Sequence, residues 1–363
     1  MNDIHEYKCP ACGGAVEFDS ATQKMLCPFC GSSYEVSDFT TEAEEADKNG
    51  SENVNSQGFE MGGYGWQEGE TEGMRVYSCI SCGGEIVGDA NLGATKCPYC
   101  DNQIVMTGQF SGGLRPEYII PFKLDKKAAK DKLKNHICTK KFVPKPFKDE
   151  NHLDEIKGVY VPFWLFDADV DANISYNTTR VRHWTEGDYR CEETSYFRVE
   201  RDGSIAFERI PADGSSKMDD TLMESIEPFD FSGAVPFQMA YMAGYVADKY
   251  DVEAESCLER INSRIKNSTV ECFRDTVKGY NSVITNSTNL NIKNGKTHYV
   301  LYPVWLLNTS WNGNRYVFAM NGQTGKFVGN IPLDKKAWWK AFGIMTTVTS
   351  ALVFGIKCLT FFL

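Results

Sequence analysis

Apolar residues recur along the chain with two different spacings, one typical of strands and one typical of helices. Between residues 172 and 207, aromatic and β-branched residues alternate with charged ones, and the stretches 187–188 and 202–204 interrupt the alternation as expected hairpin turns. Residues 253–280 carry apolar residues three or four positions apart, which predicts a long amphipathic helix. A shorter helix is expected from an Asp125 N-cap to about Ile137. The mixture predicts an α+β fold with antiparallel sheets.

Two stretches of the central region resemble each other. Ile119-Ile-Pro-Phe precedes a helical pattern and then the apolar strand that begins Pro162-Phe-Trp-Leu. Ala234-Val-Pro-Phe likewise precedes a helical pattern and then Pro303-Val-Trp-Leu. A duplication is the simplest explanation, so residues 107–336 are expected to form a duplicated α+β core.

The C-terminal residues suggest a membrane segment. Ala341 to Ile356 is a run of sixteen uncharged, mostly apolar residues, preceded by Trp338, Trp339 and lysines. As a helix, residues 338–363 would extend about 39 Å, against roughly 30 Å of hydrocarbon. Lys357, close to the far end, would have to reach the outer headgroups, and a buried C-terminal helix is the alternative. The pattern predicts a transmembrane anchor at residues 337–363, with the N-terminal bulk in the cytoplasm.

Eight of the 13 cysteines form four Cys-x-x-Cys pairs, and the first two pairs recur seventy positions later as the last two. Each copy has the spacing Cys-x2-Cys-x14-Cys-x2-Cys, which is typical of a zinc ribbon. The ribbons are expected at residues 1–36 and 75–106. Their predicted metal ligands are Cys9, Cys12, Cys27 and Cys30 in one copy, and Cys79, Cys82, Cys97 and Cys100 in the other.

Four thiolates fill the coordination shell of a zinc ion, so two structural Zn²⁺ ions are predicted and no catalytic one. A redox Cys-x-x-Cys and a secreted disulfide framework are the alternatives. Redox motifs do not come in matched fours, and the N-terminus lacks the apolar run of a secretion signal. Reduced, metal-bound thiols favour a cytoplasmic location.

Charge is distributed unevenly, although the chain has 49 acidic and 38 basic residues and a formal net charge of −11. Residues 38–74 contain ten acids and one lysine, net −9, and few aliphatic residues, so a flexible acidic linker is expected at 37–74. A short docking motif around Tyr64 and Trp66 is the alternative there. Residues 115–150 contain eleven bases and five acids, net +6. Within it, the basic stretch from Lys123 to Lys148 fits a solvated helix face, nucleic-acid phosphates or anionic lipid headgroups, with Phe142 and Phe147 as interleaved aromatics.

Sequence motifs for catalysis are weak. The chain has no Gly-x4-Gly-Lys-Ser/Thr motif, and its five histidines are scattered. Asp167, Asp169 and Asp171 alternate along a predicted strand and share a face, which favours a solvated surface over a cation site. We therefore expect that the protein is not an enzyme.

The chain resembles a bacterial family of double-zinc-ribbon membrane proteins, often labelled "TFIIB-type zinc ribbon-containing protein" and sometimes given a transferred label of primosomal helicase. Besides the ribbons, the resemblance rests on residues 210–230, on Tyr302-Pro-Val-Trp-Leu-Leu and on residues 318–326. It implies metal binding, a C-terminal membrane anchor and an accessory role in envelope stress.

These observations lead to one leading hypothesis and one alternative. The leading hypothesis is a non-enzymatic, tail-anchored zinc-ribbon adaptor, single-pass in the cell membrane, that docks a cytoplasmic protein partner. The alternative is a zinc-ribbon nucleic-acid-binding accessory protein of replication or transcription, which is not favoured.

Overall fold

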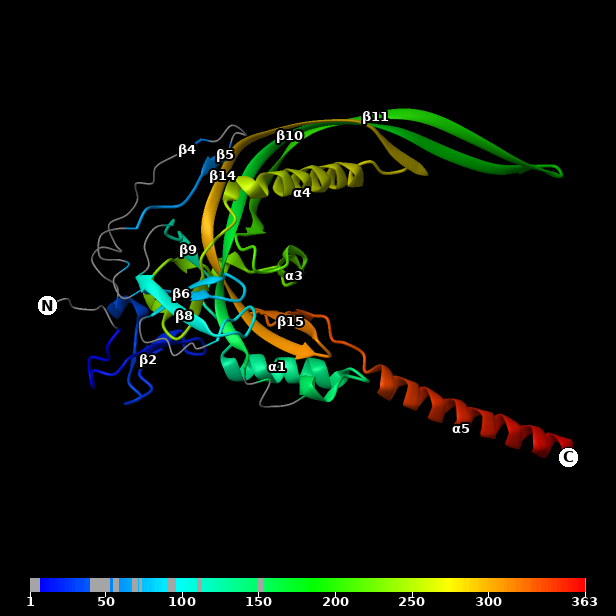
Figure 1. Ribbon diagram of the computed structural model, residues 1–363. Helices are drawn as coiled ribbons and strands as arrows, with labels where there is room; N and C mark the ends of the chain where they lie inside the picture. The colour runs from blue at the N-terminus through cyan, green and yellow to red at the C-terminus, as the bar shows by residue number, and fades with distance from the viewer. Residues whose placement is uncertain are drawn as a thin grey trace.

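The computed structural model describes residues 7–39, 53–54, 59–66, 71, 74–89, 96–109, 113–148, 153 and 155–362. Figure 1 shows a long curved sheet with small strands gathered near the N-terminal end and one helix leading away at the C-terminus. We call residues 7–39 the first ribbon and residues 74–109 the second ribbon.

The first ribbon is a small unit with its own sheet. Its strands β1 (Glu17–Asp19), β2 (Lys24–Leu26) and β3 (Ser33–Tyr34) pair in that order, and the short 3-10 helix η1 (Val36–Phe39) follows. Val16, Phe18 and Met25 are buried and pack against Ala240 and Ala243 of the core. This small apolar cluster connects the first ribbon to the rest of the molecule.

The remaining strands form one mixed sheet of thirteen strands, in the order β12-β9-β14-β10-β13-β7-β6-β8, with β11, β15, β16, β5 and β4 attached beside this path. The second ribbon contributes β6 (Met74–Cys79), β7 (Glu85–Asp89) and β8 (Ile104–Gln109). The short strands are β4 (Asn53–Val54), β5 (Phe59–Met61), β9 (Tyr118–Ile119), β12 (Val235–Pro236), β13 (Val246–Asp248), β15 (Asn314–Asn321) and β16 (Phe327–Gly329).

Three long strands form the centre of this sheet and the arch in Figure 1: β10 (Lys157–Glu186), β11 (Tyr189–Asp213) and β14 (Ser282–Trp311). Residues 159–166 of β10 are all buried, because that part of the strand is covered on both faces. Further along β10, buried and exposed residues alternate. The far ends of β10 and β11 form a hairpin that projects beyond the rest of the sheet in Figure 1. The 187–188 turn forms as predicted, but residues 202–204 continue through β11 without turning.

The helices lie at the edges and faces of this sheet. Helix α1 (Lys126–Thr139) begins at the predicted N-cap, where the Asp125 carboxylate accepts a hydrogen bond from Ala128 N–H at 2.6 Å. Helix α4 (Ala254–Asp275) places Phe273 against Ile174, Tyr176 and other residues of the long strands. The short elements are η2 (Lys145–Lys148), α3 (Asp220–Ser225), η3 (Phe231–Gly233) and η4 (Met239–Met242).

The two repeated motifs of the core lie against each other. Strand β10 pairs antiparallel with β14, with Val161 opposite Tyr302, and β9 pairs antiparallel with β12. Parallel pairs flank this centre, β9 with β14 and β10 with β13. The predicted fold class is therefore wrong about the core sheet. The sheet is mixed and not antiparallel, and the second ribbon is part of it.

The acidic segment differs from a flexible linker where the structure describes it. Phe59 in β5 is buried against Phe166, and its ring lies so close to Gly295 that a Cβ there would meet it at 2.5 Å. Trp66 packs edge-to-face on Phe237. The rest of the predicted linker, residues 40–52, 55–58, 67–70 and 72–73, lies outside the described residues.

The C-terminal residues form a helix, α5 (Lys335–Phe362), which Figure 1 shows leading away from the sheet. Among the described residues, however, no helix combines the length and the apolar character needed to cross a membrane. The uncharged run of sixteen residues is shorter than the roughly 20 that a span needs, and it contains three threonines and a serine between Lys340 and Lys357. The predicted transmembrane anchor at 337–363 and the single-pass membrane localisation are therefore wrong.

Candidate metal centres

The structure brings each predicted set of four cysteines together. Within each set, the four sulfur atoms all lie within 4.8 Å of one another. The closest Sγ–Sγ distances are 3.5 Å for Cys9–Cys30, 3.6 Å for Cys12–Cys27, 3.2 Å for Cys79–Cys100 and 3.7 Å for Cys82–Cys97. A tetrahedral ion with sulfur at about 2.3 Å has sulfur–sulfur edges of about 3.8 Å. Each set could therefore hold one tetrahedral metal ion.

All four Cys-x-x-Cys pairs use the same tight turn. The carbonyl of the first cysteine accepts from the N–H four residues later, and that later residue has a positive φ. Glycine fills this position at Gly13, Gly31 and Gly83, where the absence of a Cβ allows the conformation. Asp101 is the exception, with φ 59°. The glycines after the cysteines thus have a geometric reason, and Asp101 departs from the rule.

Polar groups favour the thiolate form, which a metal needs, at some of the sulfurs, whereas the pKa values of Cys12, Cys82 and Cys97 are raised. The Tyr34 hydroxyl lies 3.3 Å from Cys9 Sγ and lowers the pKa of Cys9 to about 6. Burial acts to raise the pKa of Cys100, but the N–H groups of Asn102 lower it to about 6. Each centre therefore contains at least one thiol that ionises readily.

The two centres differ in how the protein covers them. In the first ribbon, Cys12 and Cys30 are exposed, and Phe29 between the last two cysteines is 75% exposed. In the second ribbon, the equivalent residue, Tyr99, is only 5% exposed. The two rings lie on equivalent glycines, since a Cβ on Gly14 or Gly84 would meet the adjacent ring at 2.6 or 3.4 Å. The same aromatic position is thus presented to solvent in one copy and buried in the other.

The buried ring of Tyr99 lies near one polar group of the core, the carboxyl of Asp248. Burial and then the nearby Asp248 carboxylate raise the pKa of Tyr99 well above its usual value. Asp248 lies at the end of β13 and accepts a hydrogen bond from Ser215 Oγ. Burial raises the pKa of Asp248 to about 7. The second centre therefore packs on the core through the buried ring of Tyr99, which lies near the buried carboxyl group of Asp248.

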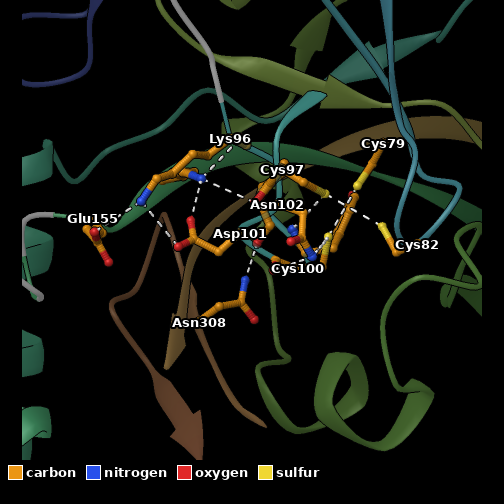
Figure 2. Close-up of polar contacts among 12 residues, drawn as sticks. Cys79, Cys82, Lys96, Cys97, Cys100, Asp101, Asn102, Glu155 and Asn308 are labelled. Carbon is orange, nitrogen blue, oxygen red and sulfur yellow. Dashed lines mark hydrogen bonds and ion pairs between the residues drawn. The ribbon is translucent and has the colours of Figure 1, made fainter. Parts of the chain in front are cut away.

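Polar contacts around Lys96 and Asp101 hold the last metal loop of the second ribbon, and Figure 2 shows these residues. Lys157 Nζ donates to the carbonyl oxygens of Lys96 and Cys97 at 3.1 and 3.2 Å. Asp101 forms ion pairs with both lysines, at 3.3 Å to Lys157 and 3.4 Å to Lys96. Lys96 also lies 3.4 Å from Glu155. The side chain at the exceptional position of the turn thus connects the metal loop to the start of β10.

The other candidate sites look structural. Asp171 pairs with Lys293 at 2.7 Å, and Asp169 accepts from Asn294 at 2.8 Å. Asp167 and Glu117 hold His298 between them, at 3.4 and 2.8 Å, and the hydrogen bonds that its ring donates to these two carboxylates raise the pKa of His298 to about 9. The three aspartates are thus held in ion pairs and hydrogen bonds on a strand face.

The basic stretch lies mainly on α1 and the turns that follow it. Lys126 and Lys127 are exposed on the first turn of the helix. Phe147, proposed as an interleaved aromatic, is 1% exposed and packs on Tyr316 and Phe318. It is a core residue and is not available to stack on a base.

Sequence reasoning did not single out Tyr99, Asp248, Lys157 or Asp101 as site residues. One signal was present, because the seventy-residue repeat changes Gly31 to Asp101 and Phe29 to Tyr99. A departure from the repeat at a metal loop indicates a position where one copy makes a contact that the other does not.

Comparison with known proteins gives one similar chain. The protein is 32% identical over 353 residues to the uncharacterised protein YdjG of Bacillus subtilis (strain 168), which covers 96% of this chain and 97% of that protein. No family model matches the chain, and no solved structure matches it. The similarity extends through both ribbons and the core.

Proposed function

The chain belongs to the family of YdjG, and we propose that it is a non-enzymatic adaptor in which two structural zinc ions stabilise the ribbons and the first ribbon docks a partner protein. Zinc is the proposed metal because four thiolates at tetrahedral spacing suit it and leave no open coordination position for chemistry. Metal binding would then serve folding and presentation of a surface.

The observation that carries this proposal is the unequal use of two equivalent aromatic residues. Tyr99 docks the second ribbon on the core of its own chain, whereas Phe29 lies in the same pose on the first ribbon and is exposed. A large aromatic side chain on a rigid metal loop loses little conformational entropy on binding, which suits it to anchor an interface. The first ribbon would thus bind another protein through Phe29, as the second ribbon packs on the core through Tyr99.

Charge and shape add to the argument. Phenylalanine has no hydroxyl, so its socket on the partner would be apolar, without the buried carboxylate that faces Tyr99. The metal loops beside Phe29 are also exposed, since Pro10, Ala11 and Cys12 of the other loop reach solvent. A partner would therefore contact both loops of the first ribbon around a central aromatic ring.

Site-specific photo-crosslinking in the cells of origin tests this function. The full chain would carry a benzophenone amino acid at position 29 or, as the matched control, at position 80, since Ile80 is 86% exposed on the second ribbon. We expect a discrete protein adduct from position 29 and none of the same mass from position 80. Identical adducts from both positions, or none from position 29, would contradict the adaptor function.

The nucleic-acid alternative rests on the exposed lysines at the start of α1. It predicts DNA or RNA binding whose affinity falls steeply with salt and weakens when Lys126 and Lys127 are changed to Gln. Because Phe147 is buried, base stacking does not support this alternative. Salt-dependent binding by the zinc-loaded chain, together with a nuclease-sensitive adduct at position 29, would favour it over a protein partner.

A further inference from the structure

A cavity of about 460 Å³ lies where the two ribbons meet the core. This volume lies within the roughly 300–1,000 Å³ of small-molecule sites. Its walls come from β1 of the first ribbon, the last metal loop and β8 of the second ribbon, the start of α1, the start of β10 and β13. None of the eight ligand cysteines lines it, and a ligand there would not require the adaptor function.

The inner wall of the cavity is apolar. Phe18, Ile156 and Trp305 line it and are buried. The Trp305 indole N–H already donates to the Leu124 carbonyl at 3.1 Å, and the ring of Tyr245 stacks on Phe122 at 4.3 Å. These side chains therefore offer hydrocarbon and ring surfaces to an occupant, and an apolar body would fit them.

The rim of the cavity is charged, and three of its four charged residues are lysines, Lys96, Lys126 and Lys157, against Glu17. Lys157 is fixed by carbonyls of the metal loop and by Asp101. Lys126 is exposed, and no carboxylate pairs with it in the contacts described for this part of the chain. One cation at the mouth is thus available to an anionic group.

The nearby carboxylates limit how much negative charge the site would accept. Asp101 and Glu155 pair with Lys96, and Asp101 also pairs with Lys157, so these lysines are partly neutralised, and Glu17 also lines the cavity. A polyphosphate would meet repulsion from these groups, whereas a single carboxylate needs only one free ammonium group. The rim therefore selects a monoanion.

Backbone features keep the cavity open and fix its walls. A Cβ on Gly158 would meet the Tyr245 ring at 2.7 Å, so glycine lets that ring form the wall. Phe18 N–H donates to the Ala243 carbonyl at 3.1 Å, which ties the first ribbon to the core beside the cavity. The site is thus assembled from segments distant in sequence that are held by hydrogen bonds.

From this geometry we propose that the cavity binds a small monoanion with an apolar body, an aryl or acyl carboxylate. The carboxylate would lie at the mouth near Lys126, and the apolar body would fill the space between Phe18, Tyr245 and Trp305. Lys157 lines the cavity and holds the Lys96 and Cys97 carbonyls of the second ribbon, and Phe18 of the first ribbon also lines it. An occupant would therefore contact both ribbons and the core.

Isothermal titration of the full, zinc-loaded chain tests this site with three probes: decanoate, 2-naphthoate and decylammonium. We expect saturable 1:1 binding of at least one carboxylate and weaker binding of decylammonium. Binding of naphthoate alone assigns an aryl body, and binding of decanoate alone assigns an acyl body. Absence of saturable carboxylate binding, or equal affinity for decanoate and decylammonium, would overturn the proposal.

Charge reversal at the mouth provides the second arm of the experiment. Lys126→Gln should weaken carboxylate binding about fivefold, the scale of one exposed charge contact, and Lys126→Glu should reverse the preference toward decylammonium. Lys127→Gln, on the same helical turn but not lining the cavity, is the control and should leave both affinities unchanged. Zinc content and circular dichroism show that each variant is folded. Equal effects of the changes at 126 and 127 would overturn the assignment.

Discussion

The two ribbons share a spacing, a turn geometry and a sulfur arrangement, yet the protein uses them differently. The first has a three-stranded sheet of its own and touches the core through a small apolar cluster. The second contributes three strands to the thirteen-stranded sheet and buries Tyr99 against β13. A metal-binding unit can thus be a separate module or a part of a larger sheet, depending on a few contact residues in and around the metal loops.

The largest difference between the two ribbons is expected when each centre loses one metal-ligating cysteine. The equivalent buried cysteines Cys27 and Cys97 allow this comparison. Cys97→Ser should remove one metal ion and lower the melting temperature of the core by more than about 10 °C, because metal binding and sheet folding are coupled there. Cys27→Ser should also remove one metal ion but lower the core transition by less than about 3 °C. Calorimetry with metal analysis measures both.

Hydrogen exchange locates these effects. After Cys27→Ser, faster exchange should be confined to the first ribbon. After Cys97→Ser, it should extend into β7 and β13, which pair at Val87 and Ala247. Equal destabilisation of the core by the two substitutions would mean that the ribbons are integrated to the same degree.

The second prediction truncates the equivalent aromatic residues. Tyr99→Ala should destabilise the chain by about 3–4 kcal/mol, because it removes a buried ring and leaves a cavity. Phe29→Ala should change stability by less than about 0.5 kcal/mol, because that ring is exposed. Urea unfolding of the zinc-loaded proteins measures both. A large loss from Phe29→Ala would show that the first ribbon depends on this ring for its own folding.

The local chemistry of these units could be predicted from sequence better than their placement could. The eight cysteines are recognisable because metal coordination fixes the spacing of the ligands, and the Asp125 cap depends only on residues three positions apart. Burial of Phe59 depends instead on its pairing beside Gly295, which lies more than two hundred positions away. No local pattern carries that information.

Two errors have the same origin. Gly203 was expected in a turn, but it lies in β11, where a Cβ would contact the Phe273 ring at 3.5 Å. The second ribbon was expected to be separate, but β7 pairs with β13 of the core. In both cases a partner from another part of the chain decided the structure, and the candidate cavity between the ribbons could not be foreseen for the same reason.

The third prediction concerns pH and the buried acid that faces Tyr99. Burial raises the pKa of Asp248 from 3.8 to about 7, so its contribution to stability is fully present below pH 3.8 and is lost as pH rises through about 7. Between about pH 4 and 7, attachment of the second ribbon should therefore weaken by up to about 1.4 kcal/mol per pH unit, and the slope should flatten above pH 7. Asp248→Asn should reduce this slope. Amide exchange of β6 and β7 measures it, with the first ribbon as internal control, and an unchanged slope in the variant would assign the effect to another group.

The smallest effect is expected at the turn position that is Gly31 in the first ribbon and Asp101 in the second. Asp101 adopts φ 59°, which costs about 1 kcal/mol relative to glycine, but its carboxylate pairs with Lys96 and Lys157. These partly exposed ion pairs contribute about 1 kcal/mol at most, so Asp101→Gly should leave stability within about 0.5 kcal/mol of wild type.

Gly31→Asp in the first ribbon introduces the same strained conformation without these two lysines and should destabilise that ribbon by about 1 kcal/mol. Competition with a metal chelator at the two centres measures both changes. If Asp101→Gly instead releases metal from the second centre much faster, the carboxylate holds the metal loop in place to a degree that the ion-pair distances alone do not suggest.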